Sequence, residues 1–327
     1  MDNILLLDTS VGSLNKGDEI IMKCVRAQLA PITRHANVFT VPTHLSPFDW
    51  FHVARGSLRV QFYRDTKYKF VGGSNLLTMN LLTHFPQWNI NPVNYKPLEG
   101  CILLGVGAGK GDRMNGYTRW LYRKVLSHRY THSVRDERTK RLVESLGLKA
   151  INTGCPTMWS LTPEHCRSIP KRKADDVVFT LTDYARDEER DQLMIDTLNK
   201  CYDRVYIWLQ GSQDYEYFNT LKRTERIEII PPSVEEYERV LRTDVDVVGT
   251  RLHAGIFAMR HRKRTVIVAV DERALGMSET YNLNTIERKE LHRLEALLHS
   301  EFATDVNVDF EAVDRWLGQF VPRRLEA

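Results

Sequence analysis

The sequence lacks any long apolar run. No stretch reaches the roughly 18 consecutive apolar residues that a membrane-spanning helix requires. The longest runs, NILLL at 3–7, CILLGVGAG at 101–109 and TVIVAV at 265–270, have the length of buried strands. The beginning of the chain, MDNILLLDTS, also lacks the basic region and the longer apolar stretch of a secretory signal peptide. We therefore expect a cytoplasmic protein.

Signatures of metal sites and hydrolases are missing as well. The sequence contains no HExxH motif and no GxSxG motif, which disfavours a metalloprotease and a serine hydrolase. Its five cysteines are odd in number, widely spaced and without a CxxC pair. This pattern favours reduced thiols in the core over disulfides or a zinc site. We expect no bound metal.

Charge of either sign is not in large excess. The net charge is only +4, and 42% hydrophobic residues against 27% charged residues suit a packed core. Basic residues gather in PKRK at 170–173, RHRKR at 260–264 and PRR at 322–324. We interpret these clusters mainly as solvated ends of helices and linkers, with an anionic substrate or a peripheral contact with an anionic membrane surface as the alternative. We expect no nucleic-acid partner.

Short apolar runs alternate with segments of helical period, which is the pattern of βα units and parallel sheets. The length of 327 residues suits two domains. We predict an α/β protein with an N-terminal Rossmann-like domain at 1–154, a proline-containing linker at 155–174 and a C-terminal Rossmann-like domain at 175–327. Two such domains bind ligands at the carboxyl ends of their strands, in a cleft between them. The architecture resembles the glycosyltransferase type known as GT-B.

The expected elements of the two domains follow from this pattern. In the first domain we predict strands at 3–8, 38–42, 69–72, 101–106, 129–134 and 150–153 and helices at 17–30, 75–83, 116–127 and 136–147. In the second we predict strands at 177–182, 204–210, 226–230, 245–249 and 265–270 and helices at 187–201, 213–222, 233–242, 252–261, 285–299 and 309–319.

Polar groups follow the predicted strands in three segments. In the first, Asn15, Lys16, Gly17 and Asp18 open a helix after the strand at 3–8. The unpaired amides and the positive dipole end of a helix N-terminus can bind an anion. Asn15 or Asp18 can equally be a simple helix N-cap, and the two interpretations are compatible.

The second and third segments carry arginines. Arg135 and Asp136 follow the strand at 129–134, where the alternative is a capping aspartate and an arginine in a surface ion pair. Arg251 and His253 lie where the buried strand at 245–249 passes into a helix. Arginine matches carboxylate and phosphate groups, and histidine exchanges a proton near neutral pH. This pair suits acid–base chemistry on a small anionic substrate.

A glycine-rich run, LLGVGAGKGDRMNG at 103–116, also follows a strand. Its spacing fits neither GxxxxGK[ST], which would need glycine at Leu104, nor GxGxxG, which would need glycine at Lys110. A backbone contact with a ligand through glycines such as Gly107 and a plain tight turn both remain open.

Together these segments resemble one family. NKGDEIIM at 15–22, VGGSNLL at 71–77, LLGVGAG at 103–109, SVRDERT at 133–139 and GTRLHAGIFA at 249–258 occur in the order typical of polysaccharide pyruvyl transferases. Family members often carry a third glycine at the position where this chain has Ser74, so the loop there departs from the family's pattern. The resemblance runs from residue 8 to about 271, most of the chain.

The resemblance implies a function and roles for particular residues. A pyruvyl group would pass from phosphoenolpyruvate to two hydroxyls of a sugar, forming a cyclic ketal and releasing phosphate. The sugar would belong to a cell-surface polysaccharide, such as an exopolysaccharide, or to its lipid-linked precursor. The reaction would need no tightly bound cofactor. Arg135 and Arg251 would grip the carboxylate and phosphate, and His253 would protonate the enol carbon or the leaving phosphate. Gly73, Ser74 and Gly107 would contribute to substrate binding. The first domain would take the acceptor and the second the phosphoenolpyruvate.

Two alternatives accompany this prediction. One is a GT-B-type glycosyltransferase that uses a nucleotide sugar, for which only Asp271 or Glu272 offers a carboxylate to the ribose; the other is a non-enzymatic sugar-binding or anion-binding member. The aromatic segments 43–70 and 83–100 could recognise the acceptor by ring stacking or anchor long connections to the core. We name no acceptor sugar from the sequence.

Overall fold

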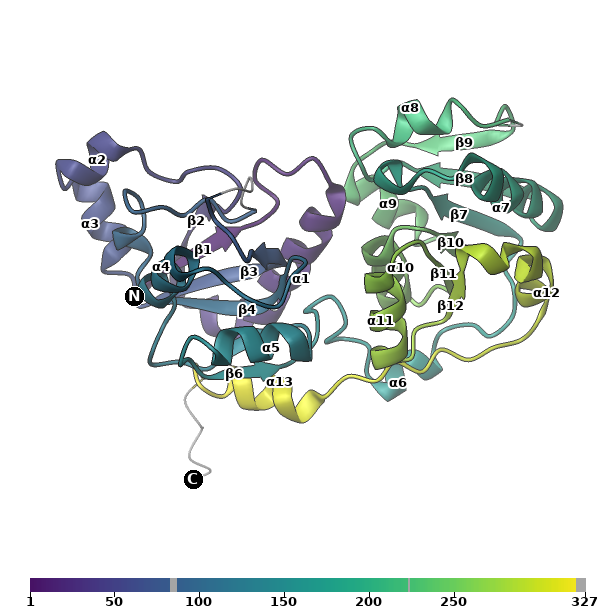
Figure 1. Ribbon diagram of the computed structural model, residues 1–327. Helices are drawn as coiled ribbons and strands as arrows, with labels where there is room; N and C mark the ends of the chain where they lie inside the picture. The colour runs from purple at the N-terminus through teal and green to yellow at the C-terminus, as the bar shows by residue number, and fades with distance from the viewer. Residues whose placement is uncertain (83–86, 223, 322–327) are drawn as a thin grey trace, which may run out of the picture. The chain divides into compact units, whose positions relative to one another are not determined.

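The chain forms two compact units in the computed structural model, which describes residues 1–82, 87–222 and 224–321, without the side chains of Glu272 and Arg273 (Figure 1). Unit 1 contains residues 1–13, 21–159 and 309–321, and unit 2 contains residues 14–20 and 160–308. The division near Trp159 falls within the expected linker. Two segments differ from the expected division. Residues 14–20, from the N-terminal part of the chain, belong to unit 2, and residues 309–321, from the C-terminal part, belong to unit 1.

Unit 1 is built on a six-stranded parallel sheet of order β2-β1-β3-β4-β5-β6. Its strands are β1 (Asp2–Asp8), β2 (Ala36–Pro42), β3 (Tyr68–Leu77), β4 (Cys101–Ala108), β5 (His132–Val134) and β6 (Ala150–Asn152). The apolar run of β4 is buried along its whole length. A parallel sheet that is covered on both faces requires such continuous apolar strands.

Helices cover both faces of this sheet. They are α1 (Lys16–Thr33), of which residues 21–33 belong to unit 1, α2 (Trp50–Ala54), α3 (Leu58–Arg64), η1 (Lys96–Leu98), α4 (Gly116–Val125), α5 (Glu137–Glu144) and α13 (Phe310–Leu317). The rings of Trp316 and Phe320 pack edge-on against Phe70 of β3. This aromatic contact explains why the C-terminal helix joins unit 1.

Unit 2 has a second six-stranded parallel sheet, of order β12-β11-β10-β7-β8-β9. Its strands are β7 (Asp176–Thr180), β8 (Arg204–Trp208), β9 (Ile227–Ile230), β10 (Val245–Gly249), β11 (Thr265–Ala269) and β12 (Thr285–Glu287). In Figure 1, α9, α10 and α11 flank one face and α7 and α12 the other. The predicted fold class of two Rossmann-like α/β domains is confirmed.

The helical elements of unit 2 are mostly short. They are α6 (Pro163–Arg167), η2 (Asp183–Ala185), α7 (Glu188–Cys201), α8 (Asp214–Phe218), α9 (Val234–Val240), α10 (Leu252–Arg260), α11 (Glu272–Tyr281), η3 (Arg288–Arg293) and α12 (Leu294–His299). The first turn of α1, residues 16–20, also belongs to this unit.

One predicted helix, at 75–83, is wrong for all of its described residues, and another, at 285–299, is wrong in part. Residues 75–77 continue β3, where Leu76 and Leu77 are fully buried, residues 78–82 lie outside any helix, and residue 83 lies outside the described residues. A short apolar run does not by itself distinguish a central strand from a helix. The predicted helix at 285–299 begins as the edge strand β12, paired with β11, before it becomes helical. The helices α2, α3, α6 and α11 were not predicted.

Candidate functional site

The order of strands marks one place in each sheet where a ligand is expected. In unit 1 the chain runs from β1 to β2 and then returns to the other side of β1, and in unit 2 it runs from β7 to β9 and then returns to place β10 beside β7. In open parallel sheets, ligands bind outside the carboxyl ends of strands at such reversals. Arg251 and His253 follow β10, and Ser74 lies in the last part of β3.

In unit 1, Arg135 lies at the carboxyl ends of three adjacent strands. The residue is 6% exposed, and its Nη2 donates a hydrogen bond to Oδ1 of Asn75 near the end of β3. Its backbone N–H donates to the carbonyl of Val106 in β4 at 3.2 Å. Its Nε lies 3.6 Å from a carboxylate oxygen of Asp136, which caps α5 by accepting from the N–H of Thr139. We call Asn75, Gly107 and Arg135 the Arg135 cluster.

Gly107 leaves room for this arginine. A β-carbon at Gly107 would collide with the guanidinium of Arg135 and would lie 2.8 Å from Oδ1 of Asn75. Such separations are far shorter than van der Waals contact, so no larger residue fits without moving the cation. The glycine in LLGVGAG is therefore explained by close packing against Arg135. The predicted residues Gly107 and Arg135 lie together in the structure.

Ser74 adopts a backbone conformation that glycine takes more easily. Its φ is 108°, and the pairing of β3 with β4 shifts register between Ser74 and Leu77. Side chains with a β-carbon rarely occupy this region, whereas glycine does so readily. The neighbouring Gly73 comes close to the carbonyl oxygen of Gly105, at 3.0 Å from the position of a β-carbon. A glycine preference at position 74 thus has a structural cause.

The end of the glycine-rich run is held as a turn by an arginine. Nη2 of Arg138 donates to the carbonyls of Gly109, at 2.6 Å, and of Gly111. Its Nε pairs with Asp112 at 2.9 Å. These carbonyls point toward a cation of the protein, so the tip of the run behaves as a structural turn, while Gly107 within β4 contacts Arg135.

In unit 2, Arg251 is buried between two carboxylates. It is 4% exposed, and its Nη2 lies 2.8 Å from Oδ1 of Asp183 and also contacts Oδ1 of Asp214. Its Nε donates to the carbonyl of Leu181 at 2.8 Å, and its guanidinium lies 5.2 Å from the ring centre of Tyr184. The bonds of this side chain to described residues thus run through Nε and Nη2.

Asp214 organises the loop after β8. Its Oδ2 accepts from the backbone N–H groups of Gln210, at 3.1 Å, and Gly211, at 2.7 Å, while Oδ1 accepts from the N–H of Asp183 at 3.1 Å and from Arg251. Burial raises the pKa of this carboxyl group, and the charge of Arg251 opposes that rise. We call Asp183, Gln210, Gly211, Asp214 and Arg251 the Arg251 cluster.

The NKGD segment is attached to the Arg251 cluster. Nε2 of Gln210 donates to Oδ1 of Asn15 at 2.7 Å, and the N–H of Lys16 donates to the carbonyl of Gln210 at 2.9 Å. Asn15 caps α1, because its Oδ1 accepts from the N–H of Gly17 at 2.9 Å. Asp18 donates its N–H to the carbonyl of Asn15.

These contacts occupy the first three amides of α1 within the unit. The amine of Lys16 lies 2.5 Å from a carboxylate oxygen of Glu19. A β-carbon on Gly17 would approach Nε2 of Gln210 to 2.9 Å, so the segment also packs tightly against this residue. These contacts account for the residues Asn15, Lys16 and Gly17 without a bound anion. Binding of substrate by residues 15–18 stays a prediction.

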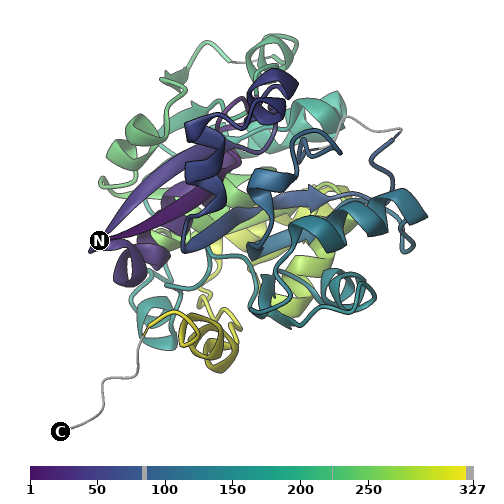
Figure 2. The ribbon, with the colours of Figure 1, turned by 90° about the vertical axis from the view of Figure 1, so that its left-hand side faces the viewer.

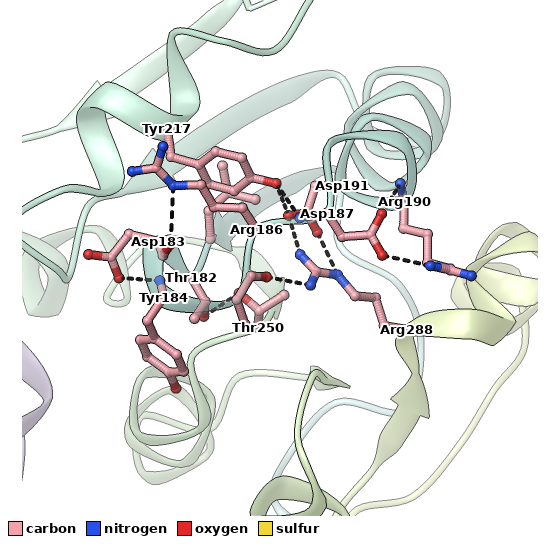
Figure 3. Close-up of polar contacts among 12 residues, drawn as sticks. Thr182, Asp183, Tyr184, Arg186, Asp187, Arg190, Asp191, Tyr217, Thr250 and Arg288 are labelled. Atoms are coloured by element: carbon pink, nitrogen blue, oxygen red, sulfur yellow. Dashed lines mark hydrogen bonds and ion pairs between the residues drawn. The ribbon is translucent and has the colours of Figure 1, made fainter.

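A second polar network supports the loop that carries Asp183 (Figure 3). The hydroxyl of Tyr217 donates to Asp191 at 2.5 Å and accepts from the N–H of Asp187 at 3.0 Å. Arg288 forms an ion pair with the same Asp191, which is fully buried. Burial raises the pKa of the Tyr217 hydroxyl. This network joins the start of α7 to α8 and η3, behind the loop between β7 and α7.

His253 is the second residue of α10, in its first turn, and its side chain is partly exposed. Arg251 is the residue just before α10 and has an extended backbone, with φ −93° and ψ 101°. The flanking glycines have packing roles: a β-carbon on Gly249 would lie 2.6 Å from the backbone nitrogen of Thr180, and one on Gly255 would lie 2.8 Å from Ile267. The motif GTRLHAG thus combines close packing with one partly exposed imidazole.

The structure brings the predicted residues together in two groups. Gly73, Ser74, Gly107 and Arg135 lie at the carboxyl ends of strands in unit 1, and Asn15, Lys16, Gly17, Asp18, Arg251 and His253 lie in the corresponding region of unit 2. The sequence analysis missed Asn75, Asp183, Gln210 and Asp214. Asp183 and Asp214 each follow a predicted strand, and this position was the available signal.

The aromatic segments have mixed roles. Trp88 is buried and stacks on Tyr122, and Tyr63 packs against Phe39, so both anchor connections to the core. Trp50 is exposed. Residues 83–86, at the start of the second segment, lie outside the described residues.

The basic clusters also differ from one another. Arg264 of RHRKR is buried and ion-paired with Asp246 at 2.8 Å, whereas Lys171 and Arg172 of PKRK are exposed. The cluster PRR at 322–324 and the side chain of Glu272 lie outside the described residues. All five cysteines are free thiols, and four of them are buried.

The fold and the site define a class: a two-domain α/β protein of the GT-B type with a buried arginine cluster at the carboxyl edge of each sheet. The sequence model of the polysaccharide pyruvyl transferase family matches residues 15–272. The chain therefore belongs to the polysaccharide pyruvyl transferase family, and membership implies a transferase. The prediction of the family from the ordered motifs is confirmed.

Comparison with solved structures shows the fold alone. The UDP-GlcNAc 2-epimerase of Methanocaldococcus jannaschii, solved with UDP-GlcNAc and UDP, superposes with a TM-score of 0.50 at 12% identity, covering 96% of this chain and 98% of the other. A second UDP-N-acetylglucosamine 2-epimerase gives a TM-score of 0.53 at 10% identity, covering 98% and 95%. A search of curated proteins found no match. Among the described residues, no helix is long and apolar enough to cross a membrane.

Proposed function

We propose that this chain transfers a pyruvyl group from phosphoenolpyruvate to two hydroxyls of one sugar in a cell-surface polysaccharide or its lipid-linked precursor. The products are a cyclic ketal and inorganic phosphate. Family membership supports the transferase class. The observation that carries the finer proposal is that each parallel sheet has a basic side chain at its carboxyl edge, the buried Arg135 in unit 1 and the partly exposed His253 in unit 2.

In this proposal Arg135 holds the carboxylate or the phosphate of phosphoenolpyruvate. A guanidinium is the side chain best matched to either group. Asn75 and Asp136 direct this guanidinium, and Gly107 lets it lie against β4. Arg251 supplies the second cation, while Asp183 and Asp214 hold its side chain in place.

His253 donates the proton that starts the reaction. Its proton passes to the methylene carbon of the enol, the double bond is consumed, and the central carbon becomes an oxocarbenium-like cation. The first sugar hydroxyl adds to that carbon and loses its proton. The bond between the central carbon and the phosphate oxygen then breaks, phosphate leaves, and the second hydroxyl adds to the same carbon and closes the ketal. One of the two hydroxyl protons restores the proton of His253, and the other goes to the departing phosphate. General acid catalysis of this kind typically contributes about 10²–10⁴-fold in rate.

The proposal requires no tightly bound cofactor and treats phosphoenolpyruvate as a co-substrate. The nucleotide-sugar alternative has support only from the fold, because the epimerase solved with UDP-GlcNAc and UDP is only 12% identical to this chain. A cytoplasmic location stays a prediction.

Phosphorus NMR of the protein with phosphoenolpyruvate and candidate saccharides tests the proposal. We expect inorganic phosphate to appear only when an acceptor with two suitably placed hydroxyls is present. A parallel sample contains a nucleotide sugar in place of phosphoenolpyruvate. The proposal would be overturned in favour of a glycosyltransferase if the nucleotide-sugar sample released nucleoside diphosphate while no phosphoenolpyruvate sample released phosphate in an acceptor-dependent way.

A further inference from the structure

Large apolar side chains are exposed close together in the segment of residues 45–64, which contains α2 and α3. Trp50 is 67% exposed and Leu58 is 84% exposed, and Leu45, Phe51 and Phe62 are also exposed. None of the residues of α2 is buried. Figures 1 and 2 both place α2 and α3 at the periphery of unit 1. Burial of apolar surface stabilises folded proteins, so folding of unit 1 alone does not account for these exposed groups.

The segment is nevertheless attached firmly on its inner side. Val60 of α3 is buried, and Phe62 contacts the ring of Phe39 in β2 with centroids 4.8 Å apart. Tyr63 packs against Phe39 and Phe48. Ser57 caps α3 by accepting from the N–H of Val60. The outward residues therefore stand on a fixed base, in the manner of a docking surface.

Basic side chains are interleaved with the exposed apolar groups. Arg55, Arg59 and Arg64 are all exposed, and the guanidinium of Arg55 lies 4.0 Å from the ring centre of Phe51. Asp49 is the one acidic residue between 45 and 64, and it caps α2 and pairs with His52 at 2.7 Å. Three arginines less one aspartate leave this segment with a net charge of +2.

A second basic surface lies on the same face of the sheet. The residues Gly116, Arg119, Trp120, Arg123, Lys124 and His128 line a depression of about 540 Å³ on α4. Val60 of α3 and Leu121 of α4 belong to one hydrophobic core, and both helices pack against η1. Both helices therefore belong to one layer of unit 1, and Arg123 and Lys124 of α4 are exposed.

We infer that the 45–64 segment docks onto the surface of an anionic phospholipid bilayer. Tryptophan and phenylalanine side chains are favourable at the level of the lipid headgroups, where an apolar body meets a polar boundary. Each arginine near an anionic membrane surface contributes about 1 kcal/mol of attraction. A short helix with exposed aromatic residues and adjacent arginines suits an interfacial position rather than a membrane span.

The charge distribution favours a lipid surface over a second copy of the chain. Two copies that met through this segment would place their arginines against each other, and like charges in an interface oppose association. A bilayer rich in phosphatidylglycerol supplies the complementary negative charge. The inference does not depend on the proposed reaction, because binding to vesicles needs no turnover of phosphoenolpyruvate.

Co-sedimentation with vesicles tests the inference. We expect the wild-type chain to bind vesicles of phosphatidylglycerol and phosphatidylcholine and to bind vesicles of phosphatidylcholine alone much more weakly. The double variant Arg55→Glu/Arg59→Glu should lose at least about tenfold in affinity for the anionic vesicles. Trp50→Ser/Leu58→Ser should weaken binding to them without changing the melting temperature, since both side chains are exposed.

Matched controls lie in unit 2. Lys171→Glu/Arg172→Glu makes the same change of charge at another exposed basic cluster, and Leu193→Ser/Ile229→Ser removes two other exposed apolar side chains. Both controls should bind anionic vesicles like the wild type. Failure of the wild type to sediment, equal losses in the controls, or a stable dimer in light scattering that Trp50→Ser/Leu58→Ser disrupts would each overturn the inference.

Discussion

The carboxylate of Asp214 lies against the guanidinium of Arg251, and both side chains are almost completely buried. Asp214 also accepts three backbone N–H groups, from Asp183, Gln210 and Gly211. One carboxylate therefore fixes the direction of the arginine and the shape of the loop to which the NKGD segment is attached. Removing a single partner from a buried ion pair leaves an uncompensated charge.

We predict that Asp214→Asn lowers the free energy of unfolding by about 3 kcal/mol, as expected for breaking a buried pair. An asparagine cannot accept all of these bonds, because its NH₂ group faces donors. Asp183→Asn is the matched control on the same arginine. Asp183 is less buried, with a side chain 15% exposed, so its loss should be clearly smaller. Urea denaturation followed by tryptophan fluorescence compares the two, and equal losses would contradict the central role of Asp214.

Substitution of His253 should separate chemistry from folding. We predict that His253→Ala reduces acceptor-dependent phosphate release at least about a hundredfold, because the general acid is lost. The melting temperature should change little, since the side chain is partly exposed. Phosphate release at the wild-type rate would rule out His253 as the proton donor. His128→Ala, which alters an exposed histidine of unit 1, is a control that should leave the rate unchanged.

Gly107→Ala should displace Arg135. The added β-carbon would collide with the guanidinium, so we expect the KM for phosphoenolpyruvate to rise about tenfold or more, which corresponds to about 1.4 kcal/mol of binding. Gly109→Ala is a close control, because its β-carbon would meet nothing nearer than the carbonyl oxygen of Leu77 at 3.7 Å. Steady-state kinetics measure both variants. A normal KM in Gly107→Ala would mean that Arg135 does not bind this substrate.

Ser74→Gly should stabilise unit 1. Serine at a φ of 108° is strained, and glycine relieves that strain, so we predict a gain of about 1 kcal/mol in the free energy of unfolding. The melting temperature reports the change. Ser300→Gly is the control, because Ser300 has an ordinary φ of −78° and glycine there should bring no gain. A lower melting temperature in Ser74→Gly would show that the hydroxyl of Ser74 makes a larger contribution than the strain.

His132 should make the stability of unit 1 sensitive to acid. Its Nδ1 accepts from the N–H of Leu103 at 3.1 Å and its Nε2 lies 3.0 Å from the carbonyl oxygen of Ser127, so the neutral ring is the form that fits. Burial lowers the pKa of His132 to about 4. Its ordinary pKa is about 6.5.

The sign of the pH effect follows from this difference. Above about pH 6.5 the ring is neutral in both states, and as the pH falls from there toward 4 only the unfolded chain gains the proton. We predict that the wild type loses about 3 kcal/mol of stability across this interval relative to His132→Gln. Urea titrations at several pH values measure the difference. Parallel curves for the two proteins would contradict a buried neutral histidine.

Much of the site could be predicted from local sequence because parallel sheets place strand ends together. The runs CILLGV and VDVVG predict buried strands, and the polar residues that follow them must lie at the carboxyl edge. Arg135, Arg251 and His253 were predicted as site residues in this way. Asn75 was missed because LLTMNLL was assigned to a helix, whereas β3 continues through Leu77.

The sequence by itself determined the alternation of strands and helices, the two-domain class and the motifs at strand ends, because these depend on apolar period and on turn residues close together in the chain. Only the tertiary structure decided how those residues are used. Arg251 meets carboxylates 37 and 68 positions away, and the segment 14–20 pairs with residues 195 positions further along the chain. Such contacts depend on packing between distant elements, which local period does not encode.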